Sequence, residues 1–181
     1  MKIRISADST CDLSPELVEK YDVAILPLYI VKDGVSYADG LEICPQDIYG
    51  HVNGGGAMCS TAAVSVADYE AFFTEQRKSC DALIHFHISS EMSSCYQNAC
   101  IAAENLDNVF SVDSRNLSTG IGQLVIAAAE MISPPSRRAS ATPRADFPVA
   151  VGPVMTRTRF FISGASQKIS LSFFIKMQYS S

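Results

Sequence analysis

Residues 82–94 read ALIHFHISSEMSS, and this stretch decides the fold class. Ala82 to Ile88 is a mostly apolar run, which is typical of a strand buried on both faces of a sheet. A serine-rich loop follows, and residues 94–106 then have the composition of a helix. A buried strand that leads through a polar loop into a helix predicts one step of a parallel α/β sheet.

The same alternation of strand and helix extends in both directions from this stretch. Ser14 and Pro15 mark a helix start as N-cap and first helical residue. Pro27 falls inside the apolar run 23–31 and predicts an edge or a bend in that strand. Further strands are predicted at 2–7 and 108–112, and a short one follows a hairpin turn at 32–35 and ends at Tyr37. The helix that starts at Ser14 ends near Tyr21, and further helices are predicted at 45–52, 65–78 and 120–132. We therefore predict a doubly wound α/β fold over residues 1–132, with a mostly parallel sheet and helices on both of its faces.

The composition changes abruptly after residue 132. Residues 1–132 hold seven basic and 18 acidic residues, a net charge of −11, whereas residues 133–181 hold seven basic residues and one acid, a net charge of +6. The second segment also has five of the eight prolines and no cysteine, and no amphipathic period persists in it. We predict an α/β domain over 1–132 followed by an irregular, basic, Pro- and Ser-containing tail, whose origin a frameshift or a truncation would explain.

Charge and hydropathy exclude several classes of function. The whole chain carries −5 at pH 7, which disfavours nucleic acid as a partner. No apolar stretch is long enough to span a bilayer, and Asp8 stands where a secretory signal needs apolar residues. We expect a cytoplasmic protein whose six widely spaced cysteines are reduced and bind no metal.

Four hydroxyl-rich segments precede or follow the predicted strands. In a doubly wound sheet the loops after the strands meet at the carboxyl-end edge, where ligands bind. We predict that Ser9, Thr61, Ser93 and Ser114 all lie along this edge of one sheet. Hydroxyls and free backbone N–H groups at helix N-termini form a receptor for an anion, although capping a helix is the commonest task of any single serine. The segments are 8–10, 60–61, 89–94 and 113–120.

The residues offer little for catalysis or for a phosphate. There is no Gly-x-Ser-x-Gly motif, and no histidine falls on the hydroxyl-rich segments. The glycine run at 54–56 lacks the Lys-Ser/Thr of a phosphate loop, and Arg115 is the only base on the four segments. A singly charged carboxylate fits these segments better than a polyphosphate. His85 and His87 share one face of their strand; that spacing suits a metal, but we expect packed, hydrogen-bonded histidines and no cofactor.

Five motifs, in their order and spacing, resemble the DegV family over residues 1–132. The family has Ile-Ser-Ser-x-Leu-Ser-Gly-Thr-Tyr-Gln-x-Ala where this chain has Ile88 to Ala99 as ISSEMSSCYQNA. The other motifs are Asp8 to Leu13, Leu26-Pro27-Leu28 with Gly34 to Asp39, Thr61 to Val64 leading to Asp68-Tyr69, and Val112 to Ser114 with Ser118, Gly120 and Gly122.

The resemblance implies a bacterial protein that binds a long-chain fatty acid and is not itself an enzyme. Some members present the acyl carboxylate to a partner fatty acid kinase. The residues carried over as carboxylate ligands are Thr61 and Ser93, with Ser9, Ala62, Ser94 and Ser114 as secondary candidates on the same segments. Ala62 lacks a hydroxyl that the family usually has, and Ser94-Cys95 replaces Gly-Thr. Family members also have a second lobe that residues 133–181 do not match.

Two other interpretations stay open from the sequence. One is a small hydrolase or transferase that uses Ser93 as its nucleophile, which labelling by an acylating probe would reveal. The other is a truncated product without activity. Acyl chain length, saturation and oligomeric state cannot be deduced from these residues.

Overall fold

The computed structural model describes residues 1–132; the irregular tail expected over 133–181 lies outside the described residues. The main sheet has four parallel strands in the order β2-β1-β6-β7. They are β1 (Ile3–Asp8), β2 (Ala24–Leu26), β6 (Ala82–His87) and β7 (Val109–Asp113). The parallel sheet predicted from the alternating pattern is confirmed.

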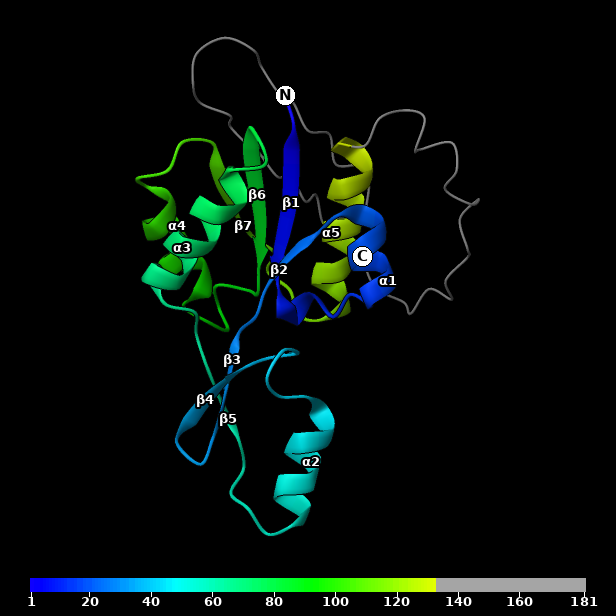
Figure 1. Cartoon of the computed structure of the whole chain (residues 1–181), viewed down its shortest axis with the longest axis vertical. Helices are drawn as coiled ribbons and strands as arrows, with labels where there is room; N and C mark the ends of the chain where they lie inside the picture. The colour runs from blue at the N-terminus through cyan, green and yellow to red at the C-terminus, as the bar shows by residue number, and fades with distance from the viewer. Residues whose placement is uncertain (133–181) are drawn as a thin grey trace, which may run out of the picture. The chain divides into compact units, whose positions relative to one another are not determined.

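Helices cover both faces of this sheet (Figure 1). On one face α3 (Val66–Arg77) packs against β6, and α4 (Cys95–Ala103) packs against β7 and α3. On the other face α5 (Thr119–Ile132) packs against β1 and β6, and α1 (Pro15–Tyr21) contacts α5. This two-sided cover explains why the strands are apolar without alternation, since neither face meets water. The doubly wound prediction is therefore correct.

The core is centred on β6, in which all six residues are buried. His85 faces α3, where it contacts the rings of Tyr69 and Phe73 at centroid distances of 5.7 and 5.4 Å. Tyr69 and Phe73 are themselves fully buried. Burying a large apolar side chain contributes about 1.5–3 kcal/mol, so α3 is fixed firmly on the sheet.

A second, smaller sheet is antiparallel, with the order β4-β3-β5. It contains β3 (Tyr29–Lys32), β4 (Val35–Ala38) and β5 (Ser60–Ala62), and α2 (Pro45–Asn53) lies between β4 and β5 in the chain. The predicted hairpin at 32–35 is confirmed. Asp33 and Gly34 both have positive φ, 52° and 79°, as a tight two-residue turn of this kind requires.

The single strand predicted over residues 23–31 is wrong, because the segment forms β2 and β3 in two different sheets. Pro27 has no N–H for a ladder. The N–H of Leu28 donates to the Ser9 hydroxyl oxygen at 3.1 Å instead of to a neighbouring strand. The chain therefore leaves the parallel sheet after Leu26 and re-forms a strand at Tyr29.

The helices begin and end close to where the sequence predicts them. The largest difference is α4, which ends at Ala103 and not near Leu106. Turn residues follow Ala103, and Asn108 adopts a positive φ of 58° before β7 begins. The glycine run ends α2 as predicted, with Gly55 at a φ of 89°. Of the helices in residues 1–132, none combines the length and the apolar character that crossing a membrane requires.

Candidate functional site

The strand order defines where a ligand can bind. The chain passes from β1 to β2 on one side and from β6 to β7 on the other, so the connections diverge between β1 and β6. A crevice forms at such a point, outside the carboxyl ends of the two strands. Here these ends lead into a 3-10 turn, Ser9–Cys11, and into the serine-rich loop 89–94.

Ser93 is half-buried and lies at the start of α4. Its hydroxyl oxygen accepts a hydrogen bond from the backbone N–H of Cys95 at 3.2 Å, and the hydroxyl donates to the Cys95 sulfur at 3.1 Å. Ser94, the residue that immediately precedes the helix, is exposed and makes no side-chain cap. The Ser93 oxygen therefore caps α4, and the Ser93 hydroxyl donates its hydrogen to a sulfur, which is a weak acceptor.

Asp113, at the end of β7, holds the serine loop in place. It accepts hydrogen bonds from the Ser90 hydroxyl at 2.6 Å, the Ser90 N–H at 3.1 Å and the Arg115 N–H at 3.0 Å. Burial would raise the pKa of Asp113, but these hydrogen bonds outweigh it and lower the pKa below the usual range. The carboxylate is thus ionised at neutral pH and stabilises the serine loop through these hydrogen bonds.

Ser9 and Ser114 lie at the predicted edge, but both hydroxyls are engaged locally. Ser9 donates to Asp39 at 2.7 Å and accepts from the Leu28 N–H at 3.1 Å. Ser114 is buried, accepts from the Asn116 N–H at 3.1 Å and contacts the Asn116 carbonyl at 3.3 Å. These serines therefore stabilise the loops that follow β1 and β7.

Thr61 lies in β5 of the second sheet and not on a loop of the parallel sheet, so the prediction that all four hydroxyls line the edge of one sheet is wrong in this respect. Figure 1 shows this second sheet beyond the carboxyl end of β1. Thr61 is an exposed residue of β5, paired with Ile30, and Ala62 pairs with Tyr29. The stretch 60–62 is too short to reveal a strand by periodicity. Its partner β3 is also hidden in the sequence, because it falls within the single strand predicted over 23–31.

Thr61 nevertheless lies just before the segment that leads into α3. The Asn98 side chain of α4 donates to the Val64 carbonyl of this segment at 2.7 Å. The next residue, Ser65, caps α3 and accepts from the Asp68 N–H at 3.2 Å. The segment that follows β5 is therefore tied to the same helix that Ser93 caps.

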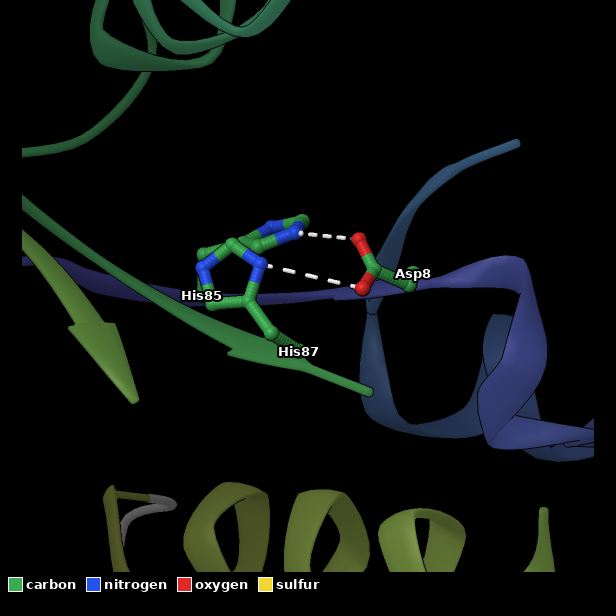
Figure 2. Close-up of side chains that lie close together, drawn as sticks. All are labelled: Asp8, His85 and His87. Atoms are coloured by element: carbon green, nitrogen blue, oxygen red, sulfur yellow. Dashed lines mark hydrogen bonds and ion pairs between the residues drawn. The ribbon is translucent and has the colours of Figure 1, made fainter. Parts of the chain in front are cut away.

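A fully buried polar cluster lies beneath this edge, and sequence reasoning missed it (Figure 2). Asp8 ends β1, and its carboxylate lies 3.0 Å from His85 Nε2 and 3.7 Å from His87 Nδ1. The Tyr69 hydroxyl lies 3.1 Å from Asp8 Oδ1 and 3.3 Å from His87 Nδ1. The Ile88 N–H also donates to Asp8, at 3.0 Å.

The charge state of the cluster follows from its burial. Burial and the neighbouring His87 lower the pKa of His85 to about 4, although the hydrogen bond to Asp8 acts in the opposite direction. Burial would raise the pKa of Asp8, yet its hydrogen bonds and charge interactions with His85 and His87 hold it well below the usual range. At neutral pH Asp8 is ionised and His85 neutral. His85 then donates from Nε2 to Asp8 and accepts from the Ser6 hydroxyl at Nδ1, 2.8 Å away.

The signal for this cluster was present in the sequence in two halves. The i, i+2 spacing of His85 and His87 correctly predicted that they share one face of β6. The sequence places their partner Asp8 only on the hydroxyl-rich segment 8–10, because nothing local in the sequence shows that β1 and β6 are neighbours. The register pairs Ser6 with His85, and this alignment brings Asp8 to the histidines.

The fold and these loops define a doubly wound α/β lobe with hydroxyl-rich loops at the carboxyl ends of its parallel strands. A family model described as "Uncharacterised protein, DegV family" matches residues 2–134. The chain belongs to the DegV family. It is 37% identical over 137 residues to a DegV domain-containing protein of Clostridium perfringens, and the match covers 72% of this chain and 48% of that protein.

Solved structures of the same family have the same fold. A fatty-acid-binding DegV family protein of Thermus thermophilus is 34% identical, with a TM-score of 0.67 over 72% of this chain and 47% of the other. DegV of Bacillus subtilis, also a fatty acid binding protein, is 27% identical, with a TM-score of 0.69 over 78% and 50%. The chain therefore spans about half the length of the relatives it matches.

Proposed function

We propose that this chain binds the carboxylate of a long-chain fatty acid at the crevice between β1 and β6, with Ser93 and Thr61 as its hydrogen-bond donors. The observation that carries the proposal is the state of the Ser93 hydroxyl. Its oxygen is fixed by the Cys95 N–H, whereas its hydrogen points to a sulfur. Turning that hydrogen to a carboxylate exchanges a weak acceptor for a charged one, which gains roughly 1.5–3 kcal/mol.

The surroundings of Ser93 suit a carboxylate head with an apolar tail. Ser93 stands at the N-terminus of α4, where the helix dipole stabilises an anion by roughly 0.3–1 kcal/mol. Met92 and Leu117, on the loops that follow β6 and β7, are 59% and 45% exposed. These apolar side chains sit next to the hydroxyl loops in the sequence and would contact the first methylenes of an acyl chain. Relatives in the family support this ligand class, since several of the solved structures are of fatty acid binding proteins.

Most of the affinity in this scheme comes from the acyl chain. Burying about 14 methylenes at about 0.8 kcal/mol each yields roughly 11 kcal/mol before entropic costs, several times the contribution of one hydrogen bond to a charged group. Burial of the acyl chain thus supplies most of the affinity, and the hydroxyls select an acid. In this role the chain is a carrier that presents the carboxylate to a partner kinase, which forms the acyl phosphate from ATP.

The competing function is acyl transfer by Ser93 as a nucleophile. Such a serine needs a base within hydrogen-bond reach. In residues 1–132 the hydroxyl of Ser93 hydrogen-bonds to Cys95 and to no histidine or carboxylate, and His87 is engaged with Tyr69 beneath the surface. The carrier role therefore fits the described residues better than the hydrolase role.

A titration with a soluble short-chain acid tests the head-group site without depending on the burial of a long acyl chain. We expect octanoate at millimolar concentration to shift the amide resonances of Ser93, Cys95 and Tyr96 in a nitrogen–proton correlation spectrum. Ser93→Ala should abolish these shifts, and Ser94→Ala, a matched change of the exposed neighbour, should leave them. Shifts that persist in Ser93→Ala, or labelling of Ser93 by a fluorophosphonate probe, would refute the carrier assignment.

A further inference from the structure

The buried cluster of Asp8, His85 and His87 has the composition of a transition-metal site. Two imidazole nitrogens and one carboxylate converge from two adjacent parallel strands, and one donor atom from each lies within 4.8 Å of the other two. All three side chains are 0% exposed. Figure 2 shows both rings turned toward the same carboxylate.

The separations match those of ligands around one ion. Zinc holds nitrogen and oxygen ligands at about 2.0–2.2 Å, which places tetrahedral ligands about 3.3–3.5 Å from one another. Asp8 Oδ1 lies 3.0 Å from His85 Nε2, and the other carboxylate oxygen, Oδ2, lies 3.7 Å from His87 Nδ1. One donor atom from each of the three residues lies within 4.8 Å of the other two, so side-chain adjustments without a change of fold would bring them around one ion.

A fourth ligand is in place. The Tyr69 oxygen lies 3.1 Å from Asp8 Oδ1 and 3.3 Å from His87 Nδ1, close enough to the cluster to supply a fourth ligand atom. Tyr69 is fully buried on α3. Four protein donors and no exposed position describe a closed, structural site and not a catalytic one.

The residues behind the donors orient them as they do in metal sites. The Ser6 hydroxyl lies 2.8 Å from His85 Nδ1; in the metal-bound form the Nδ1 proton would be donated to the Ser6 oxygen, the reverse of the metal-free tautomer, and Nε2 would be free to bind the ion. The Ile88 N–H donates to the second carboxylate oxygen of Asp8 at 3.0 Å. Partners of this kind fix the tautomer and the ring orientation of metal-bound histidines.

Hydrogen bonding alone accounts for His85 but poorly for His87. The 3.7 Å separation of His87 Nδ1 from Asp8 is too long for a hydrogen bond, and its contact with Tyr69 is 3.3 Å. The other nitrogen, Nε2, is buried and has no partner among the described residues. A metal bond at Nδ1 would replace the two long contacts of that nitrogen with one strong bond.

We propose that Asp8, His85 and His87, with the Tyr69 oxygen, bind one divalent transition-metal ion of the zinc and cobalt class. The nitrogen donors favour these ions over magnesium and calcium, which take oxygen ligands only. Because the donors are buried, the ion is taken up as the chain folds and links β1, β6 and α3. The proposal does not depend on the fatty acid site.

Metal content after refolding tests the proposal on the whole chain. The protein is unfolded with a chelator, refolded with or without zinc chloride, desalted, and analysed by inductively coupled plasma mass spectrometry. We expect one zinc per chain, and a Tm several degrees higher than that of the zinc-free protein. Less than a tenth of an equivalent, with no change in Tm for zinc or cobalt, would overturn the proposal.

Variants locate the ion, and the third histidine serves as the control. Asp8→Asn and His87→Phe should each lower zinc content at least tenfold; His87→Phe fills the same space beside aromatic rings and retains the fold if Asp8→Asn does not. His51→Gln changes the partly exposed histidine 3.5 Å from Asp33 and should keep the full equivalent. Full zinc content in His87→Phe, or its loss in His51→Gln, would overturn the assignment.

The six cysteines are the competing ligands, and cobalt separates them from the cluster. Cobalt bound by nitrogen and oxygen in a tetrahedral site absorbs in the visible range without the near-ultraviolet band of a thiolate–cobalt bond. We expect the visible bands alone, lost in His87→Phe. A thiolate band at one cobalt per chain would place the ion on cysteine and refute the proposal.

Discussion

The Asn98 side chain donates a 2.7 Å hydrogen bond to the carbonyl of Val64. This bond joins the helix that Ser93 caps to the segment that follows Thr61 in the chain, so one contact sets the relation of the two proposed carboxylate donors. Neither residue carries a group that would bind the ligand itself.

Asn98→Ala should therefore act on stability and on the ligand site together. The loss leaves the Val64 carbonyl without this donor and should lower the free energy of unfolding by about 1–2 kcal/mol. Urea unfolding followed by circular dichroism measures the change. The octanoate shifts at Ser93 should also weaken; unchanged shifts would show that the Asn98 bond does not position the site.

A pair of serines tests which helix caps are real. Ser65 accepts from the Asp68 N–H and caps α3, whereas Ser14 precedes α1 without a side-chain cap. We expect Ser65→Ala to cost about 1 kcal/mol in urea unfolding and Ser14→Ala to cost a few tenths at most. Equal losses in the two variants would contradict the capping geometry.

Two helical glycines should respond to alanine in opposite directions. A Cβ at Gly122 would lie 2.7 Å from the backbone carbonyl oxygen of Cys11, where α5 crosses the turn after β1. A Cβ at Gly50, in α2, meets nothing within 4 Å. We expect Gly122→Ala to lower the free energy of unfolding by about 1–3 kcal/mol and Gly50→Ala to raise it by about 0.5–1 kcal/mol. Thermal unfolding of both variants checks the signs.

The stability of the serine loop should depend on acid through Asp113. The pKa of Asp113 is lower in the folded chain than in the unfolded one, so the folded state favours the ionised form. This contribution is present above the ordinary carboxyl pKa of 3.8 and is lost as pH falls through the lower folded value.

Asp113→Asn isolates that contribution. The variant should lose about 1–2 kcal/mol at pH 7, since its amide accepts more weakly from Ser90, and the loss should shrink as the pH falls below 3.8. Urea titrations at a series of pH values measure both. A difference between variant and parent that stays constant from pH 7 to pH 3 would refute the role of the Asp113 charge.

Local patterns predicted the strands and helices of the main sheet, because apolar runs, caps and turn residues act over a few neighbours. What they could not predict depends on contacts between distant residues. The chain leaves the main sheet at Pro27 and forms β3 in a second sheet, and Thr61 pairs with β3 there instead of lying on a loop of the main sheet. The pairing of Ser6 with His85 brought Asp8 to the histidines. The serine-rich segment 89–94 predicted that Ser93 lies at a helix start, but only the structure shows that Ser93 and not Ser94 caps α4.

The last prediction concerns affinity for long-chain acids. The chain spans about half the length of its relatives, and we propose that in those relatives the half outside the match covers part of the acyl chain. Leaving half of about 14 methylenes in water removes on the order of 5 kcal/mol, or three to four decades of affinity. The hydroxyls cannot replace that contribution, because a carboxylate in an open crevice keeps competing bonds to water. We expect the 181-residue chain to bind palmitate weakly or not at all in calorimetric titrations.

Residues 1–132 joined to the second half of the Clostridium perfringens relative should bind palmitate clearly. In that fusion Ser93→Ala should weaken binding about tenfold or more without changing the Tm, and Ser94→Ala should not. Sub-micromolar binding of palmitate by the 181-residue chain would contradict the two-half argument, and an unchanged constant in Ser93→Ala would remove Ser93 from the site.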